Sequence, residues 1–139
     1  MSNIHGNLYA CLLRIAQFQR EAVDRTTLHA ALEASLQKTP ANQPAEQARQ
    51  ILVSAFRELN FPAIKWATQA DRQTPFPALL FSESTGWGVL KGINGHGRWV
   101  IDFFNPTTNA WEEAERERLE KCLLAQVKLA KPYRVSDST

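Results

Sequence analysis

The chain has 139 residues, of which 44% are hydrophobic and 22% are charged, and its formal net charge is +2. This length suits one domain with its own core, and the composition excludes a disordered or low-complexity chain. The 16 basic residues are scattered among 14 acidic ones, so the charge pattern predicts no nucleic-acid partner.

The sequence carries no signal for membrane insertion or export. No stretch reaches the roughly 18 consecutive apolar residues of a spanning helix, and the N-terminus lacks the basic-then-apolar layout of a signal peptide. We therefore expect a soluble domain. Cys11 and Cys122 both lie in apolar surroundings, which favours reduced thiols over a disulfide between them. The histidines have no paired spacing with acidic residues, so no metal site is predicted.

The first half of the chain carries the apolar periodicity of three helices. Residues 7–19 place apolar side chains at three- and four-residue intervals, and a second stripe covers residues 28–36. Candidate N-caps of the second helix are Asp24, Thr26 and Thr27. A third helix starts at Pro44, which a first helical turn tolerates, and its apolar stripe continues to Leu59.

The second half of the chain predicts short strands. Residues 63–68 alternate well enough for a first strand, and residues 75–106 predict an antiparallel meander. The strands of the meander are residues 76–81, 87–93 and 99–103. Ala110 and Trp111 predict a short strand leading into a charged helical turn at 112–120, and residues 122–130 predict a closing strand. We expect an α+β fold with three N-terminal helices packed on an antiparallel sheet of about five strands.

The apolar faces of these elements predict a core where the helices meet the sheet. Its members are Leu12, Ile15, Leu52, Phe56, Leu79, Val89 and Ile101. Two tryptophans of the meander, Trp87 and Trp99, are large enough to be core residues as well.

Three motifs accompany this order of elements. They are the run from His5 to Leu12, the strand from Gly86 to Leu90, and Val100 to Pro106 with its Asp-x-x-Asn-Pro element. Together they resemble the papain-like leader-peptidase domain at the N-terminus of bacterial ABC exporters, the family that trims double-glycine leaders from bacteriocins. The resemblance implies a papain-like fold. By it, residues 3–131 form the peptidase-like domain and residues 132–139 begin a linker or disordered tail.

The resemblance also implies that catalysis has been lost. The family's nucleophilic cysteine would fall at Gly6 and its histidine at Gly86 or Trp87, so neither a thiolate nor an imidazole is supplied. The carboxylate that orients the histidine is retained as Asp102, although an acid at a strand end also suits a turn cap. An orienting acid alone cannot perform acyl transfer, so we expect no enzyme and no cofactor.

Degenerate members of this kind resemble the peptidase-like domains of type I secretion exporters, which move RTX proteins and adhesins. By that resemblance, the domain recognises an unfolded export substrate before translocation, at the cytoplasmic face of the bacterial inner membrane. Its partners would include the membrane and ATPase domains of the same transporter. Candidate substrate-binding residues are Trp87, Tyr9, Trp66 and Trp99, with Trp87 favoured because it lies beside the vacated catalytic position.

Two alternatives remain open. In the first, the domain is a cysteine peptidase or hydrolase with Cys11 as nucleophile and His96 or His29 as base. A cysteine within an apolar helical stripe is usually core, where burial disfavours its thiolate, and a histidine between two glycines suits an exposed turn. In the second alternative, the chain is a free-standing protein-interaction domain.

Overall fold

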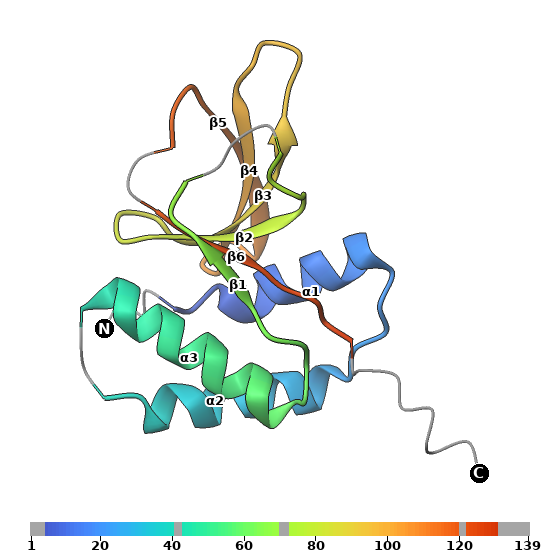
Figure 1. The fold of residues 1–139 in the computed structure, drawn as a ribbon, viewed down its shortest axis with the longest axis vertical. Coiled ribbons are helices and arrows are strands. Elements are labelled where there is room, and N and C mark those ends of the chain that lie inside the picture. The colour runs from blue at the N-terminus through green and yellow to red at the C-terminus, as the bar shows by residue number, and fades with distance from the viewer. Residues whose placement is uncertain (1–4, 41–42, 70–72, 120–121, 131–139) are drawn as a thin grey trace.

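Within residues 5–40, 43–69, 73–119 and 122–130, which the computed structural model describes, three helices form one layer and six antiparallel strands form the other (Figure 1). The predicted α+β class and the packing of N-terminal helices on an antiparallel sheet are confirmed. None of the described helices is long and apolar enough to cross a membrane. The tail predicted at residues 132–139 lies outside the described residues, as do both ends of the predicted domain at 3–131.

The helices begin and end at the local signals in the sequence. Their bounds are Leu8–Gln19 for α1, Arg25–Lys38 for α2 and Pro44–Glu58 for α3. The carboxylate of Asp24 accepts hydrogen bonds from the backbone N–H groups of Thr26 (3.1 Å) and Thr27 (3.4 Å), so Asp24 is the N-cap of α2. Pro44 lies in the first turn of α3, where a missing N–H leaves no hydrogen bond unmade.

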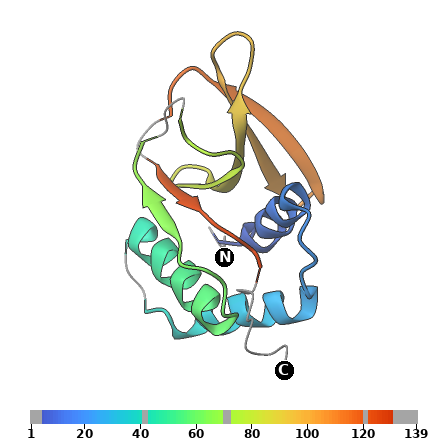
Figure 2. The same ribbon diagram turned by 45° about the vertical axis from the view of Figure 1, so that its right-hand side comes forward.

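The sheet has the strand order β1-β6-β2-β3-β4-β5, and each strand is antiparallel to its neighbours. Its strands are β1 (Lys65–Ala67), β2 (Ala78–Ser82), β3 (Gly86–Ile93), β4 (Trp99–Asn105), β5 (Ala110–Arg116) and β6 (Leu123–Gln126). The predicted meander is β2 to β4, whose β3–β4 turn lies at the end farthest from the helices (Figure 2). The predicted closing strand is β6, which lies between β1 and β2.

The prediction of a helical turn at residues 112–120 is wrong. In the structure, β5 continues to Arg116 and pairs along its whole length with β4, from Asn105 opposite Ala110 to Trp99 opposite Arg116. Glutamate, alanine and arginine favour helices in isolation, but pairing with an existing strand overrides that weak preference. The sheet therefore has six strands among the described residues, and β5 is one of its edges.

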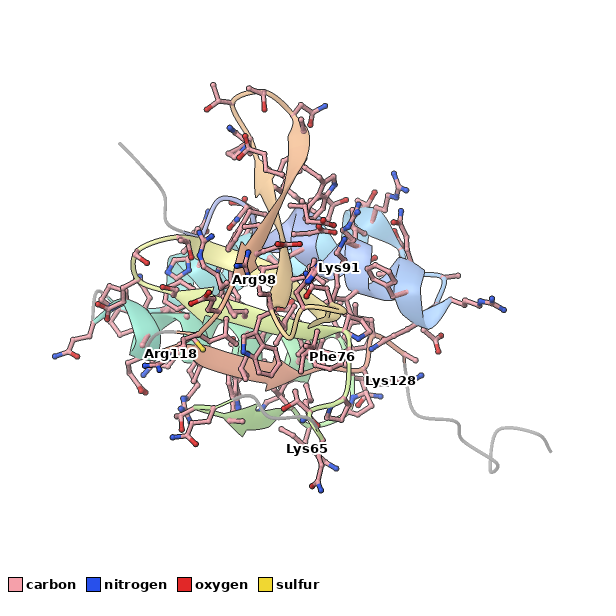
Figure 3. The ribbon with its side chains drawn as sticks, turned by 90° about the horizontal axis from the view of Figure 1, so that it is seen from above. Lys65, Phe76, Lys91, Arg98, Arg118 and Lys128 are labelled. Atoms are coloured by element: carbon pink, nitrogen blue, oxygen red, sulfur yellow. The ribbon has the colours of Figure 1, made fainter. Side chains whose placement is uncertain are left out.

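The sheet is apolar on both faces, but the helices cover only one of them. On the helix side, Leu79, Phe81, Trp87 and Val89 pack against the buried faces of α1, α2 and α3. On the other side, a smaller buried cluster contains Ala78, Leu80, Leu90, Ile101 and Leu124, and no described helix contributes to it. We call this second side the helix-free face. Figure 3 views the molecule from the sheet side, where the strands lie in front of the helices and Phe76 lies near the centre.

All seven predicted core residues are buried, but one of them lies on the other face of the sheet. Six belong to the helix–sheet core, whereas Ile101 belongs to the helix-free face. The reason is strand alternation, because Ile101 pairs with Leu90 while its neighbour Asp102 pairs with Val89 on the helix side.

Replacing Leu52 with Ala should lower the free energy of unfolding by about 2–5 kcal/mol, because a fully enclosed leucine leaves a cavity. Leu52 is 0% exposed in α3, whereas Phe18 in α1 is 48% exposed and serves as the control. Phe18→Ala should change stability by no more than about 0.5 kcal/mol. Urea unfolding of both variants checks this, and equal losses would show that the buried face of α3 is wrongly assigned.

Candidate functional site

The segment before α1 lies against the start of β3, so the positions that the resemblance assigns to nucleophile and base are neighbours. The side-chain amide of Asn7 donates to the carbonyl oxygen of Trp87 (2.6 Å), and the backbone N–H of Trp87 donates to Asn7 Oδ1 (3.3 Å). Gly6, the residue before Asn7, is exposed. Gly6 and Trp87, the positions that the resemblance assigns to nucleophile and base, therefore carry neither a thiol nor an imidazole.

Trp87 is fully buried, so the prediction that it forms an accessible substrate platform is wrong. Its ring packs against Phe81 with 4.9 Å between ring centroids, and its indole Nε1 donates to His5 Nδ1 (3.0 Å). The reason is that Trp87 points to the helix side of β3, as does Val89 two residues later. The alternative reading of Trp87 as a core aromatic is confirmed.

The neighbours of His5 determine which nitrogen of its neutral ring carries the proton. An indole N–H can only donate, so Nδ1 of His5 must carry a lone pair and its proton must lie on Nε2. That Nε2 lies 3.3 Å from Gln47 Oε1 on α3, which accepts the proton in a hydrogen bond. Burial lowers the pKa of His5 from its ordinary value of 6.5, against the smaller, opposite effect of the Gln47 hydrogen bond. Both nitrogens of this imidazole are therefore engaged in holding the fold.

Asp102, to which the resemblance assigns the orienting carboxylate, is 2% exposed and contacts two cations. Its carboxylate accepts from Arg14 Nε of α1 (2.9 Å) and lies 3.1 Å from Lys91 Nζ of β3. Lys91 also pairs with Glu113 of β5 (2.6 Å), and that hydrogen bond is the largest cause of the raised pKa of Lys91. The Arg14 guanidinium also stacks over Trp111, 4.4 Å from the ring centroid. Asp102 thus joins α1 to three strands instead of orienting a base.

Cys11 is unsuited to nucleophilic attack. It is 0% exposed, and burial raises the pKa of its thiol to about 12, while the Arg14 cation lowers it and the Asp102 anion raises it further. His96 lies in the exposed β3–β4 turn, and His29 is exposed on α2, where it pairs with Glu33 (3.7 Å) and packs edge-on against Tyr9. Among the described residues, no contact joins either histidine to Cys11. Both cysteines are free thiols, as expected.

The three other aromatic candidates are half-buried and do not meet in one groove. Tyr9 lies on α1, and Trp66 lies on β1 beneath the Arg49 guanidinium (5.0 Å to the ring centroid), both packed against the helix–sheet core. Trp99 lies on β4 and packs with Phe76 on the helix-free face (6.2 Å between ring centroids). A shared aromatic platform for substrate is therefore not formed.

A pocket of about 140 Å³ lies beside Gly6, between Tyr9 of α1 and the side of α2 that carries His29 and Leu36. This volume is below the roughly 300–1,000 Å³ of ordinary ligand pockets. The corner that the resemblance singles out therefore offers little room for a bound chain.

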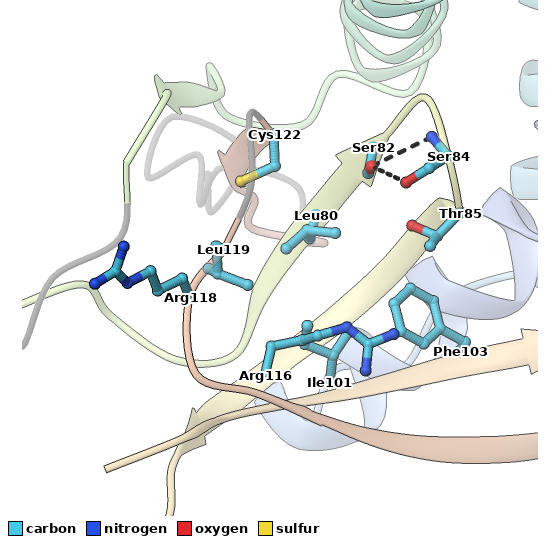
Figure 4. Close-up of a pocket in the computed structure, with 10 residues that line it drawn as sticks. All are labelled: Leu80, Ser82, Ser84, Thr85, Ile101, Phe103, Arg116, Arg118, Leu119 and Cys122. Atoms are coloured by element: carbon cyan, nitrogen blue, oxygen red, sulfur yellow. Dashed lines mark hydrogen bonds between the residues drawn. The ribbon is translucent and has the colours of Figure 1, made fainter.

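A larger pocket, of about 370 Å³, lies on the helix-free face and was not predicted (Figure 4). We call it the open-face pocket. Leu80, Ile101 and Phe103 form its apolar floor, and Arg116, Arg118 and Thr85 lie on its rim. A sequence signal for this pocket is present in β2, where the four consecutive residues from Ala78 to Phe81 are all apolar, and all four are buried. Such a run, apolar at every position, predicts a strand with two apolar faces rather than one.

Comparison with known proteins returns nothing for this chain: no family model, no curated protein and no solved structure matches it. Among the described residues, no group of three or more histidine, cysteine, aspartate or glutamate side chains could hold a metal ion.

His5 should make the domain less stable in mild acid. Its pKa is lowered on folding, so the unfolded chain binds more protons below about pH 6.5, and the unfolding free energy should fall as the pH drops from about 7 to about 5. His5→Gln removes the titration, so its stability should change less over this window. His29→Gln, at an exposed histidine, is the control and should keep the wild-type slope. Chemical denaturation at each pH measures this, and identical slopes for all three proteins would contradict the role of His5.

Proposed function

We propose that this domain is a non-catalytic recognition module that holds an unfolded polypeptide. The observation that carries the proposal is the state of the former catalytic corner. Gly6 has no side chain, Trp87 is buried as core, and Asp102 is neutralised by Arg14 and Lys91. A papain-like domain without nucleophile and base has no means of acyl transfer, so binding is the function left to it.

The sheet supports binding of an extended chain in two ways. Among the described residues, the edge strand β5 pairs with β4 alone, so its other side offers backbone groups to which an incoming strand can hydrogen-bond. Charged side chains along β5 disfavour permanent pairing at such an edge, which suits a reversible complex; they are those of Glu112, Glu113 and Glu115. The open-face pocket adds apolar surface that can receive side chains of the same chain.

The cellular setting of the proposal comes from the resemblance alone. By that resemblance, the module belongs to a type I secretion ABC exporter at the cytoplasmic face of the bacterial inner membrane. It would hand an unfolded RTX-like protein or adhesin to the membrane and ATPase domains of the same transporter. The motif that most favours this setting is Asp102-x-x-Asn105-Pro106 together with the order of helices and strands.

The domain should bind a calcium-free, unfolded RTX protein more tightly than the same protein folded with calcium, because only the unfolded form offers free backbone and scattered apolar side chains. Fluorescence titration measures both affinities. A permanently unfolded, carboxymethylated protein, titrated with and without calcium, controls for any effect of calcium on the domain itself. Gels of the same mixtures should show the substrate intact.

Equal affinity for the folded and unfolded forms would overturn the proposal. Cleavage of the substrate that disappears in Cys11→Ala would also overturn it, in favour of a cysteine peptidase.

A further inference from the structure

We infer that the open-face pocket is the binding site for a segment of extended polypeptide in which an apolar side chain and a carboxylate lie two residues apart, on the same side of the chain. This inference rests on the proposed function, which it deepens by naming the site and the chemistry of the ligand. The proposed site lies on the opposite side of the sheet from Trp87 and from the corner formed by Gly6 and Asn7.

The floor of the pocket is built to receive an apolar group. Leu80 and Ile101 are 3% and 2% exposed, and the ring of Phe103 lies beside them. Phe103 fits against β3 because Gly88 has no side chain: a Cβ there would lie 2.8 Å from Phe103 Cε1. The glycine therefore lets the ring lie close to the strand. Covering this floor removes apolar surface from water, which favours binding of an aliphatic or aromatic side chain.

The rim supplies positive charge through two arginines. Arg116 projects to this face from the end of β5 and extends toward Phe103, with Arg118 farther along the same segment (Figure 4). Within the part of the chain that the structure describes, neither has a carboxylate partner, whereas Arg98 pairs with Glu115 and Glu117. The Arg116 guanidinium donates to the carbonyl oxygen of Glu115 (3.1 Å). An arginine with spare donors beside an apolar floor suits a carboxylate.

The remaining wall supplies hydrogen-bonding groups suited to a peptide backbone. Ser82 and Ser84 lie at the β2–β3 turn with their hydroxyl oxygens 2.9 Å apart, and Thr85 follows them (Figure 4). Hydroxyls donate and accept, so they match both the N–H and the C=O groups of an extended chain. An apolar side chain on the floor, a carboxylate at Arg116 and backbone at the turn use all three parts of the pocket.

The charge around the pocket argues for a peptide carboxylate over a polyanion such as a nucleic acid. Glu112, Glu113, Glu115 and Glu117 all lie on or directly after β5, the strand that carries Arg116. A chain of phosphates would be repelled by these glutamates once it extended beyond the arginines. A single carboxylate between apolar residues meets only Arg116 and Arg118.

The test uses short fluorescein-labelled peptides in which Leu and a second residue, which is Asp, Asn or Lys, lie two positions apart with Ser between them, titrated by fluorescence anisotropy against the domain at low salt. The Asp peptide should bind about fivefold or more tightly than the Asn peptide, and the Lys peptide most weakly. Arg116→Glu should abolish or reverse this order. Arg25→Glu, an exposed arginine on α2 with no ion pair among the described residues, is the matched control and should preserve it. Thr85→Trp, which narrows the pocket without removing a charge, should weaken all three peptides.

Equal binding of the Asp and Asn peptides, an unchanged order in Arg116→Glu, or unchanged affinities in Thr85→Trp would overturn the inference. If a carboxymethylated unfolded protein still binds wild type in that case, the proposed function survives and only its site is wrong. If neither peptides nor unfolded protein bind, both fail. Self-association that Arg116→Glu abolishes, with no peptide binding, would show that a second copy occupies the pocket and would also overturn the inference.

Discussion

Two hydrogen bonds between the side chain of Asn7 and the backbone of Trp87 fix the position of the first helix on the sheet. With Asn7 held at the start of β3, α1 runs across the sheet so that Arg14 reaches the buried carboxylate of Asp102. The indole of Trp87 completes this junction by donating to His5, whose other ring nitrogen reaches α3 through Gln47. The arrangement is polar and buried, and each polar group that it contains has a partner, as a buried network must.

The side chains at this junction are engaged in packing or in ion pairs. The Trp87 ring packs against Phe81 and donates to His5, and the Asp102 carboxylate neutralises Arg14 and Lys91. Breaking a buried ion pair by removing one partner is strongly destabilising, so Asp102 has a structural role here.

The sheet adds a second constraint, because it is apolar on both faces while the helices cover only one. The helix-free face is closed in part by partly buried residues such as Phe76, Trp99 and Leu119, and what remains open is the pocket between β2, β4 and the end of β5. This pocket is an apolar hollow that opens to solvent beside Arg116 and Arg118. The helix side of the sheet is closed by core packing, whereas the other side offers the surface at which we propose that a chain binds.

Local signals in the sequence predict the three helices and most of the strands. They predict the tertiary contacts less well. Asp24 and Pro44 mark helix starts through backbone chemistry that does not depend on the rest of the fold. The start of β5 is predicted at Ala110 and Trp111, but its continuation to Arg116 is not, because Glu, Ala and Arg favour a helix until pairing with β4 decides otherwise. The sequence does not reveal which face of the sheet Trp87 occupies, because a shift of one residue along a strand reverses the face. The open-face pocket depends on β2, β4 and β5 meeting in space, which no single stretch of sequence reveals.

We propose that a bound chain lies on the helix-free face and not at the corner formed by Gly6 and Asn7. Hydrogen–deuterium exchange of the domain, with and without a permanently unfolded protein, tests it most directly. The account predicts slower exchange in the β2–β3 turn and at the end of β5, with no change around Gly6 and Asn7. Protection confined to the segment before α1, with the β2–β3 turn and the end of β5 unaffected, would contradict it.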